Sequence, residues 1–172
     1  MKAARLRALI KADINLFAYH LPLDCHPVHG NNAALGRLMG IEACEALDLQ
    51  DPGTPVFRGQ LEESVTVQGL ADRLGVALDR TPLVIGEGDV KSVAWCTGAG
   101  QGYIDLAADA GADVYVTGEV SEQTAHVALE RGIAFIGAGH HATERYGVQA
   151  VGSLAAEALG LSHEFIDIDN PA

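Results

Sequence analysis

The chain has 172 residues, 48% of them hydrophobic, which is enough to bury the core of one large domain and excludes a disordered chain. Asp and Glu outnumber Lys and Arg by 23 to 11, and the resulting net charge of −12 repels phosphate backbones and argues against nucleic acid as a partner. No apolar run reaches the roughly 20 residues that span a bilayer, and three cysteines without a CxxC pair fit a reducing compartment, so we expect a cytoplasmic protein without a membrane partner.

The first half of the chain is predicted to hold three helices separated by less regular segments. The first and third helices show apolar residues at helical spacing, and the second and third begin near a residue that can cap them. The expected elements are a helix over 1–12, a strand over 14–19, a loop over 20–30, a helix that Asn31 or Asn32 caps and that runs to about Met39, strand and loop over 41–55, and a helix over 63–75 capped by Ser64 or Thr66.

The second half alternates strands and helices with short glycine turns, which is typical of βαβ units. The expected strands are 92–96, 113–117, 133–138 and 163–168, and the expected helices are 101–110, 121–131 and 143–159. The runs VYVTG and IAFIGAG lack polar alternation, so both faces of these strands should be covered. We therefore predict an α/β fold with two subdomains, 1–82 and 83–172.

A first polar cluster lies in the loop that follows the strand expected at 14–19. The segment HLPLDCHPVHGNN, residues 20–32, contains Asp24 and the histidines His20, His26 and His29. Loops at the carboxyl ends of strands are where α/β folds bind ligands, and the prolines stiffen this one. The alternative is an exposed loop in which Asp24 caps a turn and the histidines are solvated.

A second polar cluster, GHHATER, follows the apolar strand expected at 133–138. His140 and Glu144 are four residues apart, so on a helix they project from one face and can together bind a divalent first-row metal. His141 points elsewhere, because neighbours on a helix diverge by about 100°. The alternative is that Glu144 serves the amides of the helix entry.

A third segment, TGAGQG at 97–102, joins a strand to a helix. Its glycines can expose backbone N–H groups to an anion, although no P-loop lysine follows, and the alternative is a plain tight turn. Glu119 ends the next strand and can reach the same rim, or it can serve the start of a helix capped by Ser121. Cys96 is expected to be a packed thiol and not a nucleophile.

Taken together, these segments resemble the YbgI-like family, also called Nif-three-like, many of whose members carry the label "GTP cyclohydrolase I type 2 homologue". The segments that carry the resemblance are AYHLPLDCHPVHGNNAALG, VAWCTGAGQGYIDLAADAGADVYVTGEVSEQTAH, GAGHHATERYG and FIDIDNPA. The resemblance implies two-lobed α/β subunits of mixed sheets flanked by helices, assembled into a hexameric ring with a dinuclear metal site. It carries the metal-ligand role to Asp24, His140 and Glu144, and it places His20 beside the site, in a supporting or proton-transfer role.

The resemblance also implies an incomplete site. Family members supply two further ligands from a His-His-Gly segment upstream of the first loop, and this sequence begins after that point. We therefore expect a member without its N-terminal part, with an incomplete N-terminal lobe. In place of the family's two metals we expect one divalent ion at most, Fe, Mn, Zn or Mg, bound weakly.

The function expected from these residues is metal-dependent hydrolysis of a nucleotide-like or other small molecule. In the complete site of the family, a water activated by the metal would attack an electrophilic carbon or phosphorus atom, and a nearby histidine would transfer protons. The alternatives are a non-enzymatic metal-binding or oligomeric scaffold and an inactive truncated subunit. We expect a homo-oligomer in each case, since strands that would pair with a missing lobe leave exposed edges.

Overall fold

A mixed β-sheet forms the centre of the computed structural model, which describes residues 2–47 and 55–171. Six strands pair in the order β1-β2-β4-β5-β6-β3 within the described residues. They are β1 (Cys44–Ala46), β2 (Phe57–Thr66), β3 (Leu83–Ile85), β4 (Asp89–Cys96), β5 (Val114–Thr117) and β6 (Ala134–Gly137). The strands β4, β5 and β6 are parallel, and the other three run antiparallel to their neighbours. The α/β class predicted from the sequence is confirmed.

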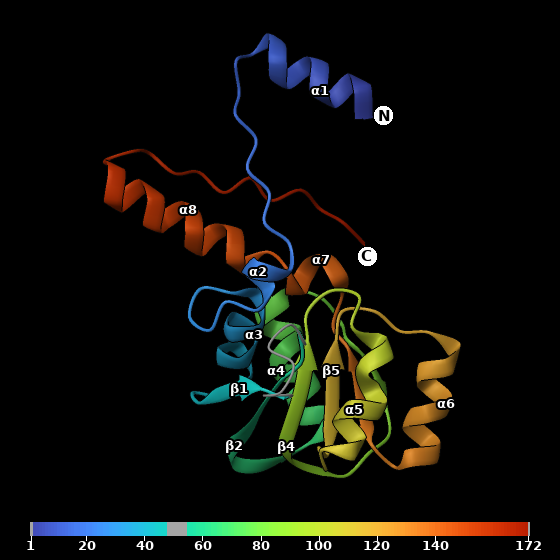
Figure 1. Ribbon diagram of the computed structural model, residues 1–172. Coiled ribbons are helices and arrows are strands. Elements are labelled where there is room, and N and C mark those ends of the chain that lie inside the picture. Colours follow the sequence, from blue (N-terminus) through green and yellow to red (C-terminus); the bar gives the residue numbers. More distant parts are fainter. Residues whose placement is uncertain (1, 48–54, 172) are drawn as a thin grey trace.

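Helices cover both faces of this sheet (Figure 1). The helices α3 and α4 lie against one face, and α5 and α6 lie against the other. The helical elements are α1 (Lys2–Lys11), α2 (Leu21–Asp24), α3 (Asn31–Met39), α4 (Val67–Leu78), a 3-10 turn η1 (Gln101–Tyr103), α5 (Ile104–Asp109), α6 (Glu122–Arg131), α7 (His140–Thr143) and α8 (Tyr146–Leu159).

The central strands are buried on both faces, as their unbroken apolar pattern predicts. Val93 and Trp95 of β4 pack with α3 and α4, whereas Ala94 and Cys96 pack with α5 and α6. All four side chains are buried. This sandwich fixes β4 firmly, so the loop that leaves its carboxyl end at Thr97 starts from a rigid base.

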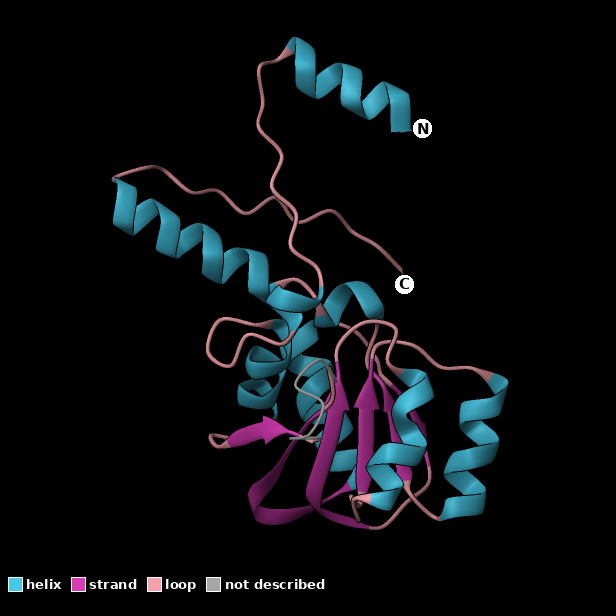
Figure 2. Ribbon diagram, viewed as in Figure 1, coloured by secondary structure: helices cyan, strands magenta, loops and turns pink. Residues whose placement is uncertain are grey.

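The carboxyl ends of the three parallel strands meet at one edge of the sheet (Figure 2). The short helices α2 and α7 lie at this edge, and α7 follows directly after β6. Loops at such an edge gather residues from several strands, which is why open α/β sheets bind ligands there.

Several expected elements differ in the structure. Residues 14–19 and 163–168 form no strand, because neither segment meets a strand edge and most of their side chains are exposed. Residues 63–66 belong to β2, and the following helix begins only at Val67, capped by Thr66, whose Oγ1 accepts a hydrogen bond from the Gly69 amide. The helix expected at 143–159 is interrupted after Thr143 and resumes at Tyr146.

The proposed division at residue 83 stays a prediction. Strands from both sides of it share one sheet, since β1 and β2 precede it and the other four follow it. The helix α1 lies apart from the sheet, joined by an exposed extended segment (Figure 1). Across the described ranges, every helix is too short or too polar to cross a bilayer.

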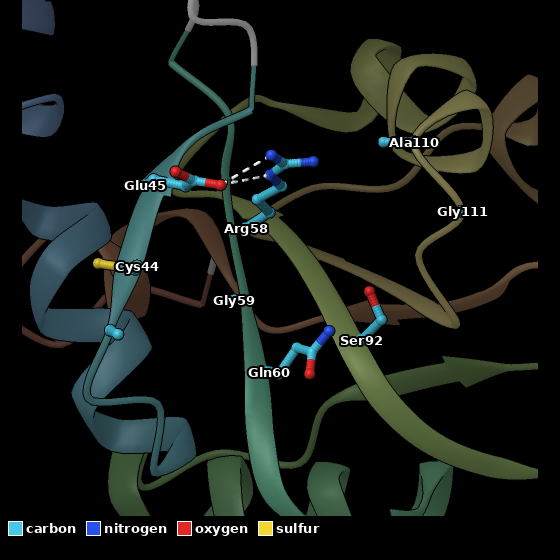
Figure 3. A pocket seen from close by; sticks show the side chains of 9 residues that line it. Cys44, Glu45, Arg58, Gly59, Gln60, Ser92, Ala110 and Gly111 are labelled. Carbon is cyan, nitrogen blue, oxygen red and sulfur yellow. Dashed lines mark hydrogen bonds and ion pairs between the residues drawn. The ribbon is translucent and has the colours of Figure 1, made fainter.

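A cavity of about 760 Å³ lies between β1, β2 and the end of α5 (Figure 3). Arg58 and Glu45 form an ion pair of 2.7 Å in its wall, and both side chains are about half exposed. Gln60 and Ser92 lie opposite each other on β2 and β4 and complete its polar surface. The cavity is distant in the sheet from the carboxyl edge that holds the residues singled out in the sequence.

Candidate functional site

A small cavity of about 180 Å³ at the carboxyl edge of the sheet collects the four residues singled out in the sequence. Asp24 and His20 reach it from α2 and the residue before it, and His140 and Glu144 reach it from α7 and the residue after it. Thr97 at the end of β4 is also part of the wall. The early loop and the late segment, far apart in the chain, therefore meet at one place.

The His140 ring is held between two carboxylates. Its Nδ1 lies 2.6 Å from Oε1 of Glu119, and its Nε2 lies 3.2 Å from Oε2 of Glu144. Partial burial opposes the charged imidazole, but the bond to Glu119 and the charges of Glu144 and Glu119 outweigh it and raise the pKa of His140. Glu119 thereby fixes the ring so that Nε2 faces the cavity.

Asp24 is buried and held by two adjacent asparagines. Nδ2 of Asn31 donates to Asp24 Oδ1 at 2.7 Å, and the side-chain Oδ1 of Asn31 accepts from the Gly147 amide at 2.7 Å. Nδ2 of Asn32 donates to the Asp24 backbone carbonyl at 3.2 Å. The expectation that one of them caps a helix is wrong: Gly30 takes that position, and both side chains turn inward to position Asp24.

Glu144 experiences an excess of negative charge. Its burial, and then the charge of Asp24, raise the pKa of its carboxyl, whereas His140 and His20 act in the opposite direction. Two carboxylates that face one small cavity, with the imidazoles of His140 and His20 beside them, favour a bound cation.

The TGAG loop supports this cavity and does not form an anion cradle. The Gly98 amide donates to Thr143 Oγ1 at 3.0 Å, and the Gly100 amide donates to Thr117 Oγ1 at 3.1 Å. These N–H groups are therefore already used inside the protein, which favours the tight-turn interpretation. Gly98 has a φ of 65°, and a Cβ there would overlap the Glu144 carboxylate.

The residues of the cavity fit a divalent metal ion, although they do not form a finished site. Among residues 2–47 and 55–171, no three His, Cys, Asp or Glu side chains converge on one point. The 3.2 Å between His140 Nε2 and Glu144 Oε2 is nevertheless the spacing of two ligands with bonds of about 2.1 Å at about 100°. Thr97 Oγ1 is buried in the described structure without a hydrogen-bond partner, so a polar group is missing here.

Cys96, which also lines the cavity, is a packed thiol as expected. Burial raises its pKa to about 12, and the charges of Asp24 and Glu144 contribute in the same direction. The raised pKa favours the folded state, and this contribution is lost as the pH rises from about 9 to about 12.

We therefore expect alkylation by iodoacetamide at pH 8 to modify Cys25 and Cys44, which are partly exposed, and to spare Cys96. Peptide mass spectrometry measures each site, and the protein unfolded in urea is the control in which all three react. Equal modification of Cys96 and Cys44 in the folded protein would contradict this prediction.

The sequence matches the model of one protein family over nearly its whole length. The model of the family described as Duf34/NIF3 (NGG1p interacting factor 3) matches residues 1–171. The chain belongs to the Duf34/NIF3 family. This confirms the resemblance found in the sequence.

Relatives and solved structures of the Duf34/NIF3 family agree with this assignment. The "GTP cyclohydrolase 1 type 2 homolog" of Haemophilus influenzae is 50% identical over 175 residues, and that of Pseudomonas aeruginosa is 51% identical over 173 residues. In both cases all of this chain covers 69% of the relative. A structure described as protein ybgI, of unknown function, has a TM-score of 0.92 at 46% identity and covers 100% of this chain and 69% of that one. The protein TTHA1606 from Thermus thermophilus has a TM-score of 0.86 at 35% identity, covering 98% of this chain and 66% of that one.

Sequence reasoning placed Glu119 at the rim but did not assign it to the site. Its part emerges only from the pairing of β5 with β6, which brings Glu119, two residues after β5, beside His140, three residues after β6. The roles of Asn31 and Asn32 were also missed, because buried asparagine side chains leave no periodic signal in a sequence. His26 and His29 do not line the cavity, and the His26 Nδ1 accepts from the backbone of its own turn.

Proposed function

We propose that the protein is a divalent-metal-dependent hydrolase that acts on a nucleotide-like small molecule. Asp24, His140 and Glu144 are the proposed metal ligands, and one ion of Fe, Mn, Zn or Mg would suit two carboxylates and an imidazole. The observation that carries the proposal is the chain of contacts from Glu119 to His140 Nδ1 and from His140 Nε2 to Glu144. Metal-binding histidines characteristically donate their other ring N–H to a carboxylate in this way.

The side chains around the cavity have distinct parts in this reaction. A divalent ion, when bound, supplies an activated water as the nucleophile. Asp24, held by Asn31, presents its remaining oxygen to the cavity, and Glu119 keeps the imidazole in the tautomer whose Nε2 can bind. His20 is exposed where it borders the cavity, so it can carry a proton between the cavity and solvent.

The proposed substrate class rests on the name of the relatives, and the volume of the cavity limits how much of the substrate it can hold. The name of the relatives refers to GTP, a nucleotide, and this supports a nucleotide-like substrate here. A cavity of about 180 Å³ holds only the reacting group, so the rest of the substrate must lie outside it.

Assembly into a homo-oligomer, a ring in its fullest form, is part of the proposal. Large apolar side chains are exposed on the N-terminal segment and on α8, among them Phe17 at 78% and Leu159 at 69%. Exposed apolar surface of this kind is typical of association sites and also supports an oligomeric scaffold as the second candidate function. Free cysteines support a location in the cytoplasm.

Metal binding to the purified chain tests the proposal. Titration with Mn²⁺ and Zn²⁺ should show binding that His140→Ala abolishes and that Glu119→Gln weakens by about 10- to 100-fold. His126→Ala, at an exposed histidine of α6, is the matched control and should bind as the unchanged chain does. The same His140→Ala variant should lose metal-dependent hydrolysis of nucleotides.

Two outcomes would redirect the assignment. Metal binding that depends on His140 without turnover of any nucleotide would favour the scaffold. Metal binding that His140→Ala leaves intact would contradict the proposed ligand set.

A further inference from the structure

A second cavity, of about 640 Å³, lies beside α7 and carries a cluster of cationic side chains. His141, the neighbour of His140, lines it together with Arg80 and Arg145. The carboxyl-terminal segment of residues 160–171, called the tail here, closes it with Asp167 and Asp169. Neither arginine has a part in the reaction proposed above.

Arg145 is fixed in place before any ligand arrives. Its guanidinium Nη2 donates to the Leu78 carbonyl at 3.3 Å, and its side chain is only 20% exposed. The other terminal nitrogen, Nη1, points to the cavity and donates to Asp167 Oδ2 at 2.6 Å. A guanidinium held in this way loses little conformational entropy when it binds an anion.

The tail carboxylate occupies this cluster as an anionic ligand would. Oδ2 of Asp167 accepts from Arg145, and its Oδ1 lies 3.3 Å from His141 Nε2. Both oxygens are therefore engaged by cationic or potentially cationic groups. Geometry of this kind, with several N–H donors around one planar anion, also suits a phosphate group.

Arg80 packs against the backbone of Gly139, where the lack of a side chain leaves room for its guanidinium. Gly139 has a φ of 96°, and a Cβ there would overlap the Arg80 guanidinium. The Arg80 side chain thus crosses the backbone just before His140, and its Nη2 donates to the Pro171 carbonyl of the tail at 3.2 Å. The second arginine of the cluster is consequently directed to the same tail.

Apart from its contacts with this cluster, the tail is bonded to α8 near its start, where the Leu161 amide donates to the Ala156 carbonyl and His163 Nδ1 lies 3.4 Å from Ser153 Oγ. It contains no helix or strand within 160–171, and Ile166 and Ile168 are 73% and 71% exposed. Of the three aspartates that line the cavity, Asp167 and Asp169 belong to the tail, and only Asp79 does not. Withdrawal of the tail therefore turns an excess of acidic side chains into an excess of arginine.

We propose that Arg80, His141 and Arg145 form a binding site for a phosphate group of the substrate, and that Asp167 of the tail occupies this site in the free chain. The proposal rests on the proposed function and gives it a place for the anionic end of a nucleotide-like substrate. The volume of the cavity lies within the 300–1,000 Å³ range of small-molecule sites. His140 and His141, which are adjacent residues of α7, then face two different parts of one substrate.

Binding of inorganic phosphate to the full chain, measured calorimetrically with a chelator present, tests this site without any metal. Arg145→Gln should lower the affinity for phosphate at least about tenfold, because a hydrogen-bonded charged donor is lost. Asp167→Asn should raise the affinity for phosphate about three- to fivefold, because a competing, half-exposed carboxylate is removed. Arg58→Gln, at the arginine paired with Glu45 in the cavity of about 760 Å³ (Figure 3), is the matched control and should leave the phosphate affinity unchanged.

Competition by guanosine and by its 5′-monophosphate identifies the group that is recognised. The monophosphate should displace phosphate, and the uncharged nucleoside should not. Since Asp167 lies on the exposed tail, its variant keeps the test valid even if Arg145→Gln weakens the fold.

The outcomes separate this proposal from the metal-dependent reaction. Phosphate binding that depends on Arg145 in a chain that binds no metal would support the anion site and contradict the proposed metal-dependent hydrolase. Equal phosphate affinity in the unchanged chain, Arg145→Gln and Asp167→Asn would overturn the anion site, whatever the result of the metal titration.

Discussion

Replacement of Gly98 by alanine is expected to abolish metal binding at the carboxyl edge of the sheet. A Cβ at this position would overlap the Glu144 carboxylate and would lie 3.2 Å from His140 Nε2. The carboxylate would have to leave the place where it faces His140. The backbone adds to the effect, because alanine at a φ of 65° costs about 1 kcal/mol more than glycine.

Mn²⁺ titration should show an affinity at least about 100-fold lower for Gly98→Ala, the loss expected when one ligand is displaced. Urea denaturation should show a free energy of unfolding lower by about 1–3 kcal/mol. Gly102→Ala is the matched control, because it lies in the same connection and a Cβ there meets no atom within 4 Å. An unchanged Mn²⁺ affinity in Gly98→Ala would mean that Glu144 does not bind the ion.

The parts of the site that follow from local spacing could be predicted from the sequence. His140 and Glu144 share a face because they are four residues apart, although Glu144 lies just past the end of α7. The strands β4, β5 and β6 were predicted to within a few residues, because a strand buried on both faces has an unbroken apolar run.

The parts that depend on tertiary pairing could not be predicted. Phe17 and Ile166 lie in segments with strand-like composition, but no strand of the sheet lies next to either segment. β-Propensity describes a fit to a half-buried pleated surface, and without a neighbouring edge it has no effect. The bond of Glu119 to His140 likewise depends on which strands are neighbours, and the spacing of the two residues in the chain carries no such information.

The second large effect is expected at Asn32, which connects the two halves of the site from a fully buried position. Its Nδ2 donates to the Asp24 carbonyl at 3.2 Å and to the Pro55 carbonyl at 3.0 Å, and its Oδ1 accepts from the Thr97 amide at 3.0 Å. Its side chain therefore holds the start of the TGAG loop against α2. Leucine has a similar shape but leaves two carbonyls and one amide without partners.

We expect Asn32→Leu to lower the free energy of unfolding by about 3–5 kcal/mol, since each unsatisfied buried group costs about 1–3 kcal/mol. Urea denaturation measures this loss. The control is Gln68→Leu at an exposed position of α4, which should change stability by less than about 0.5 kcal/mol. Because the bonds of Asn32 join the backbones that carry Asp24 and Thr97, Mn²⁺ affinity should fall with stability in Asn32→Leu. Stability within about 1 kcal/mol of the unchanged chain would show that water satisfies these groups, and that the cavity reaches solvent through the place of Asn32.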